Sequence, residues 1–81
     1  MRVTVCFHSW FKELTGCAQT SETIPDGTTL GALVENLMVR FPKLSGMRRS
    51  MLMAVDVEYQ NGGYVLQNGD EVSLFPPVQG G

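Results

Sequence analysis

The chain has 81 residues, enough for one compact domain and too few for a second. Hydrophobic residues make up 43% of the chain and charged residues 17%, a balance typical of a globular core and not of a disordered segment. The formal net charge of -2 argues against the broad cationic surface that phosphate backbones require, so we expect no nucleic-acid partner.

The cysteines and the hydropathy bear on the cellular setting and on two kinds of ligand, a membrane and a metal ion. Cys6 and Cys17 form no closely spaced pair and no disulfide framework, which favours a reduced, cytoplasmic setting. The longest wholly apolar run, Met51 to Val55, is far shorter than a membrane span, so we expect no membrane contact. Cys6 and His8 stand two residues apart, but with Cys17 they lack the spacing of a metal site, so no metal is expected.

The first segment has the alternation of a half-buried strand. Between Arg2 and Trp10 one face carries Val3, Val5 and Phe7, and the other carries Thr4, Cys6 and His8. Turn residues up to Gly16 follow, and Ala18 to Ile24 has the composition of a second, more polar strand. The two strands are predicted to form a hairpin.

A helix is predicted after Pro25-Asp26-Gly27. Thr28 or Thr29 supplies a hydroxyl that caps its free N–H groups, and Pro42 ends it. Its apolar stripe, at the spacing of one helix face, consists of Leu30, Leu33, Val34, Leu37, Met38 and Phe41. Residues 43–50 have no periodicity and are interpreted as a connection back to the sheet.

The rest of the chain predicts two or three more strands. Met51 to Tyr59 is interpreted as one strand, Asn61-Gly62-Gly63 as a hairpin turn and Tyr64 to Leu66 as a short strand. A further turn is predicted at Asn68-Gly69-Asp70. Glu71 to Phe75 alternates again and is predicted to be a central strand, with Val72 and Leu74 facing the core.

The order of elements predicts an α+β fold. One main helix crossing one mixed sheet of four to five strands is the β-grasp, or ubiquitin-like, arrangement. We expect residues 1–75 to form this domain and residues 76–81 to form a flexible tail, because Pro76 and Pro77 cannot donate ladder hydrogen bonds. Gly80 and Gly81 lack a Cβ and let the backbone enter a passage too narrow for side chains.

Three motifs carry a family resemblance that covers essentially the whole chain. The closing run NGDEVSLFPPVQGG, from Asn68 to Gly81, is similar to the DGDEVAFFPPVxGG ending of the MoaD/ThiS ubiquitin-like sulfur carriers. Lys12 to Gly16 resembles the R-E-x-x-G that follows the family's first strand, and Ala54-Val55-Asp56 resembles its A-V-N. Within the family the chain most resembles the branch of MoaD, the small subunit of molybdopterin synthase.

Four positions depart from the family pattern. Lys12 replaces the usual Arg and Asp56 the usual Asn, while Cys6 and His8 stand where apolar residues are common. These departures bear on the choice of partner and not on the fold.

The resemblance implies a group carrier that is not an enzyme on its own. An ATP-dependent E1-like (MoeB-like) enzyme is expected to adenylate Gly81, which follows Gly80, and a sulfurtransferase to convert it to a thiocarboxylate. The tail then enters the large (MoaE-like) subunit of molybdopterin synthase and gives sulfur to the dithiolene of the molybdenum cofactor. ATP is used by the activating partner, and no cofactor is expected on this chain.

A partner surface is expected around the tail. Its expected residues are Phe75, Pro76, Pro77, Val78, Gln79, Tyr59, His8 and Cys6. Cys6, His8 and Phe75 are assigned to the open face of the sheet. Tyr59 is included because members of the family commonly have an apolar residue at its position. Two interpretations of Phe75 remain open at this point: a partner contact, or a core residue folded under the tail.

Other functions are compatible with the same ending. Thiamine thiazole synthesis, tungsten-cofactor synthesis and RNA thiolation all use similar tails. A ubiquitin-like modifier would form isopeptide bonds through Gly81, and a β-grasp binding module would have an inert tail. Two terminal glycines by themselves are weak evidence, so the sulfur-carrier hypothesis depends on the strand and the prolines that precede them.

Overall fold

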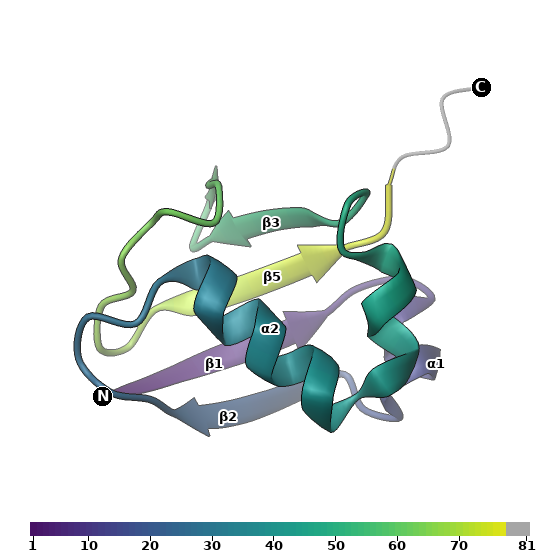
Figure 1. The fold of residues 1–81 in the computed structure, drawn as a ribbon, viewed down its shortest axis with the longest axis horizontal. Helices are drawn as coiled ribbons and strands as arrows, with labels where there is room; N and C mark the ends of the chain where they lie inside the picture. The colour runs from purple at the N-terminus through teal and green to yellow at the C-terminus, as the bar shows by residue number, and fades with distance from the viewer. Residues whose placement is uncertain (78–81) are drawn as a thin grey trace.

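A mixed β-sheet with a helix across one face makes up the computed structural model, which describes residues 1–77 (Figure 1). The strands are β1 (Arg2–Phe7), β2 (Gln19–Thr23), β3 (Leu52–Val55), β4 (Glu58–Tyr59) and β5 (Glu71–Phe75). The helices are α1 (Phe11–Thr15), α2 (Leu30–Arg40) and the 3-10 helix η1 (Pro42–Met47). The strand order β2-β1-β5-β3-β4 is the predicted β-grasp arrangement.

The first and last strands lie side by side at the centre of the sheet. β1 and β5 run parallel, with Val5 opposite Val72 and Phe7 opposite Leu74, while the other three pairs are antiparallel. β1 and β2 form the predicted hairpin, and β5 is the predicted central strand between β1 and β3. A parallel pair requires a long crossover, and here the crossover contains every other element of the fold.

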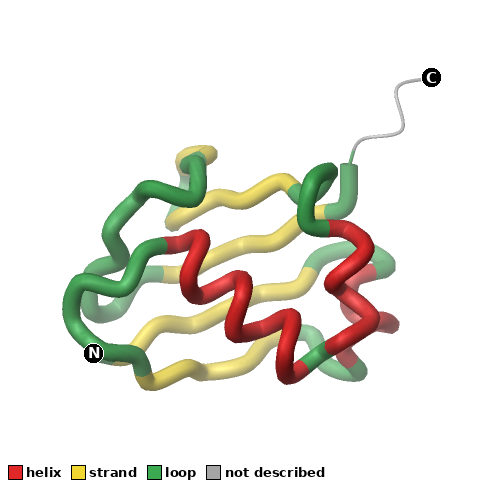
Figure 2. Tube along the Cα trace, viewed as in Figure 1, coloured by secondary structure: helices red, strands yellow, loops and turns green. Residues whose placement is uncertain are grey.

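Helix α2 covers one face of this sheet, as Figure 2 shows in red against the yellow strands. The Thr29 hydroxyl accepts the N–H of Ala32 at 3.2 Å, which confirms the predicted cap. The first five residues of the predicted stripe are buried, and Phe41 packs edge-on against Phe7 with ring centroids 5.6 Å apart. Within residues 1–77 no helix is long and apolar enough to cross a membrane.

The connection between β1 and β2 is more structured than predicted. The strand expected to reach Trp10 ends at Phe7, because the backbone of Ser9 has a φ of 56° and turns the chain out of the sheet. The fully buried Phe11 then anchors the short helix α1, which was predicted as a turn. Gly16 ends α1 in the left-handed conformation, with a φ of 79°, and its N–H donates to the carbonyl of Lys12.

The prediction of one strand from Met51 to Tyr59 was wrong, because the segment folds back on itself. β3 and β4 pair as a hairpin, with Ala54 opposite Tyr59. Asp56 makes the turn with a φ of 55°, which an aspartate tolerates better than most side chains. Its N–H donates to the Glu71 carbonyl at 2.7 Å, and its Oδ1 accepts the Glu71 N–H at 3.2 Å.

Residues 60–66 also differ from the prediction. The turn at Asn61 exists, with the Tyr64 N–H donating to the Asn61 carbonyl at 3.2 Å. In place of the predicted hairpin and the short strand Tyr64 to Leu66, the segment forms only an isolated antiparallel bridge from Val65 to Thr29. Main-chain carbonyls of this segment instead accept hydrogen bonds from the first N–H groups of α2, which lack partners within the helix. The N–H of Leu30 donates to the Tyr64 carbonyl at 2.8 Å, and that of Gly31 donates to the Gly62 carbonyl at 2.9 Å.

A buried carboxylate joins this segment to the start of β5. Asp70 is 8% exposed, and its Oδ2 accepts the Gln67 N–H at 2.8 Å and the Tyr64 hydroxyl at 3.2 Å. Its main-chain carbonyl accepts the N–H of Thr4 in β1 at 3.0 Å. Asp70 therefore organises the turn that delivers the last strand into the centre of the sheet.

We predict that Asp70→Ala lowers the free energy of unfolding by about 1–3 kcal/mol, because it leaves the Gln67 N–H without its acceptor. The matched control is Tyr64→Phe, which removes one donor and leaves the Gln67 bond in place, at a cost of about 0.5–1.5 kcal/mol. Urea unfolding followed by circular dichroism measures both. A smaller loss for Asp70→Ala than for Tyr64→Phe would contradict this role.

Candidate functional site

The two residues predicted to carry the transferred group, Gly80 and Gly81, lie outside the described residues. The predicted partner residues Val78 and Gln79 also lie outside them. Six predicted partner residues are described: Phe75, Pro76, Pro77, Tyr59, His8 and Cys6. The site is therefore built from the end of β5, the surface around it and the two prolines.

Both neighbours of β5 stop pairing with it at the level of Phe75. On one side the His8 N–H donates to the Leu74 carbonyl at 3.1 Å, and Ser9 then turns away from the sheet. On the other side β3 begins at Leu52, directly opposite Phe75. Pro76 has no N–H to donate. The chain therefore leaves the sheet immediately after Phe75, as the two prolines predict.

Cys6, His8 and Phe75 lie on the face of the sheet opposite α2. Burial alternates along β1, with Val5 and Phe7 in the core and Cys6 only partly covered. The His8 ring stacks on the Phe75 ring, with centroids 4.3 Å apart and planes within 12°. Phe75 is half-buried and does not belong to the buried core, so the interpretation of Phe75 as a core residue under the tail was wrong.

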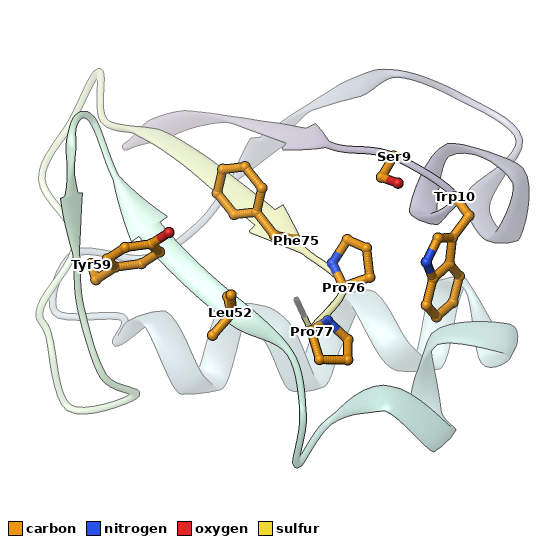
Figure 3. Close-up of a pocket in the computed structure, with 7 residues that line it drawn as sticks. All are labelled: Ser9, Trp10, Leu52, Tyr59, Phe75, Pro76 and Pro77. Atoms are coloured by element: carbon orange, nitrogen blue, oxygen red, sulfur yellow. The ribbon is translucent and has the colours of Figure 1, made fainter. Parts of the chain in front are cut away.

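A groove of about 420 Å³ opens at the point where the chain leaves the sheet. Its lining residues are Ser9, Trp10, Leu52, Tyr59, Phe75, Pro76 and Pro77 (Figure 3). A second hollow of about 200 Å³ adjoins it and shares Tyr59 and Phe75. The walls come from the connection between β1 and α1, from the β3–β4 hairpin, and from the end of β5 with the two prolines after it. A single surface therefore joins segments distant in sequence.

The residues around the groove expose unusual amounts of apolar surface. Tyr59 is 72% exposed, Trp10 is 38% exposed, and Val57, at the tip of the β3–β4 hairpin, is 95% exposed. Clustered apolar exposure of this kind marks interaction surfaces, whereas scattered apolar residues are ordinary. The surface is therefore suited to a partner that covers the root of the tail.

Three residues that line the groove, Ser9, Trp10 and Leu52, were not among the partner residues predicted from the sequence. Ser9 and Trp10 were assigned to the end of a strand, and no pattern signals the positive φ of Ser9. Leu52 was missed because the register of its segment was not fixed by alternation alone. Its place opposite Phe75 is the signal that was needed, and it depends on the long-range pairing of β3 with β5.

The Cys6 thiol sits on the same face, one pleat before His8. Burial raises its pKa above the ordinary thiol value, and the carboxylate of Glu71 raises it further. The thiol is therefore less ionised at neutral pH than a free cysteine and is a weaker nucleophile. Within the described part of the chain no three His, Cys, Asp or Glu side chains gather as a metal site would require.

Comparisons with known proteins identify relatives of this chain. The molybdopterin synthase sulfur carrier subunit of Arabidopsis thaliana is 28% identical over 100% of this chain and 84% of that protein. Its counterpart in Homo sapiens is 31% identical over 99% of this chain and 94% of that protein. Both alignments extend over more than four fifths of the relative.

Solved structures show the same fold. The putative molybdopterin converting factor subunit 1 from Pyrococcus furiosus has a TM-score of 0.88 and 26% identity, and covers 96% of this chain and 99% of that one. A chain of the complex of subunits 1 and 2 of the Helicobacter pylori molybdopterin-converting factor has a TM-score of 0.71 and 23% identity, with full coverage of both chains. The ThiS family profile matches residues 5–81, so the chain belongs to the ThiS family and is a sulfur carrier of the MoaD/ThiS type.

Proposed function

We propose that the chain is the small subunit of a molybdopterin synthase and donates sulfur from its C-terminal Gly81 to the dithiolene of molybdopterin. The observation that carries the proposal is the family match, which runs from residue 5 to Gly81 and so includes the end of the chain. The relatives in Arabidopsis thaliana and Homo sapiens, which are named molybdopterin synthase sulfur carrier subunits, support the same pathway.

The chemistry follows from the properties of a carboxylate. It is anionic and a poor electrophile, so its oxygen must first become part of a better leaving group. The carboxylate of Gly81 attacks the α-phosphorus of ATP on an E1-like enzyme, which releases pyrophosphate and gives an acyl adenylate. The persulfide of a sulfurtransferase then attacks the acyl carbon and displaces AMP. A thiol reductant cleaves the S–S bond of the resulting acyl disulfide, and the thiocarboxylate that this releases is a strong nucleophile.

Each of these partners must hold the root of the tail while its own active site receives the end. The groove at Phe75 and Tyr59 supports this role, because Pro76 and Pro77 form part of its wall. We propose that the E1-like enzyme and a MoaE-like large subunit both cover this surface. The Helicobacter pylori structure with the same fold is a complex of subunits 1 and 2 of the molybdopterin-converting factor of that organism. The use of ATP by the activating enzyme and the two free cysteines of this chain both fit a cytoplasmic setting.

Deletion of Gly81 is predicted to abolish sulfur loading without changing the fold. Incubation of the intact chain with an E1-like enzyme, ATP and a sulfur source should give a product heavier by the difference between one sulfur and one oxygen atom. Intact-protein mass spectrometry detects the change, and circular dichroism shows that the truncated chain still folds, because the core elements end at Phe75.

The same incubation separates the alternatives. A protein modifier would appear as ladders on the lysines of other proteins, and a binding module with an inert tail would acquire no sulfur at all. Reconstitution with a matched large subunit and the pterin precursor then tests the destination. A loaded chain that fails to yield molybdopterin there would assign it to another sulfur pathway.

Tyr59→Asp is predicted to weaken binding to the large subunit by about 2 kcal/mol or more, roughly thirty-fold, because it places a charge in the centre of an apolar interface. Tyr59 is 72% exposed, so the change leaves the core intact. The matched control is Val39→Asp on α2, which is 82% exposed and belongs to the helix that covers the other face. Isothermal titration calorimetry of the two variants measures the difference.

Equal binding by Tyr59→Asp and the wild-type chain would show that the partner does not cover the groove. A loss of equal size in Val39→Asp would place the partner on the helical face instead.

A further inference from the structure

Two stacked rings join His8, the residue directly after β1, to Phe75, the last residue of β5. The His8 N–H donates to the Leu74 carbonyl at 3.1 Å, and one residue further along β5 the His8 imidazole stacks on Phe75. Beyond this point Ser9 turns the chain after β1 away from the sheet, and Pro76 has no N–H to donate. The stack therefore lies at the point where the chain leaves the sheet, between the residue that follows β1 and the residue that ends β5.

The stack does not depend on a hydrogen bond by the Nε2 atom of the imidazole. The Nε2 atom of His8 is buried, and no hydrogen-bond partner for it exists among the described residues. A buried polar atom without a partner is unfavourable for stability. What the His8 side chain provides at this position is therefore its flat face, which lies within 12° of parallel to the Phe75 ring.

The position of the Phe75 ring has consequences on both sides of it. Phe75 contributes to the wall of the main groove and to that of the second hollow, so its rotamer shapes both. Phe75 is also the last residue of β5 and directly precedes Pro76. A Phe75 ring that is free to change rotamer would alter the groove at the root of the tail.

We propose that His8 is a positioning residue, which acts through Phe75 by holding its ring in the orientation that completes the docking groove. His8 itself does not line the groove, whereas Phe75 does. Parallel stacked rings restrict the rotation of each other, and a branched aliphatic chain of similar volume has no flat face with which to do so. The role assigned to His8 is thus separate from that of a residue that touches the partner.

The first test concerns Phe75 alone and requires no partner. Three-bond NMR couplings report the χ1 rotamer of Phe75 in the full chain. We expect one rotamer in the wild type and in His8→Phe, which keeps the flat face, and averaging between rotamers in His8→Leu and His8→Ala. Cys6→Ala, one pleat away on the same face, is the matched control and should keep one rotamer.

The second test rests on the proposed function and measures adenylation of the chain by the E1-like enzyme. His8→Ala and His8→Leu are expected to raise the KM for the chain roughly three- to ten-fold, with kcat unchanged, and His8→Phe is expected to restore the wild-type KM. If His8 contributed only to stability, its variants would show the wild-type KM and kcat at a temperature where all of them are folded.

One rotamer of Phe75 in His8→Leu, averaging in His8→Phe, or equal averaging in Cys6→Ala would each overturn the proposal. An unchanged KM in His8→Ala would also overturn it. If the wild-type chain is not adenylated at all, the proposed function fails, and the couplings alone then decide whether His8 positions Phe75.

Discussion

The parallel pairing of β1 with β5 is the constraint on which the other features depend. It brings the first and last strands to the centre of the sheet, so the chain must cross over between them and supply both α2 and the outer strands. Because α2 covers one face, the apolar side chains of both central strands on that face are sealed from water. The other face and the end of β5 are left for interactions outside the chain.

Two residues with positive φ border the surface that results. Ser9 ends the β1 side of the groove, and Asp56 turns the β3–β4 hairpin beside the second hollow. Non-glycine residues in this region of backbone space cost of order 1–3 kcal/mol and persist only where the surrounding structure holds them. At Asp56 two hydrogen bonds to Glu71 do so. Strain is therefore located where the strands must stop or turn to expose the root of the tail.

Much of the fold could be predicted from the sequence because the signals were local. The helix stripe, the Thr29 cap and the alternation of β1 and β5 each depend on neighbouring residues. The failures involved competition between distant segments. No local pattern indicates that Asp56 reverses the chain and hydrogen-bonds the main chain of Glu71. Nor does one indicate that main-chain carbonyls in residues 62–64 accept the first N–H groups of α2. In the site, Phe75 and Tyr59 were found through alternation and resemblance, whereas Leu52 required the pairing of β3 with β5.

The exposure of Tyr59 argues that this surface is built for association and not for folding. A side chain that remains 72% exposed removes little apolar area from water, so its contribution to the stability of the isolated chain is small. The same holds for Val57, which is 95% exposed on the adjacent turn. Their apolar area is still available for burial when another protein covers the groove. Under the proposed function this separation is needed, because the activating enzyme and the large subunit would bind and release the same surface in turn while the core that presents the tail stays unchanged.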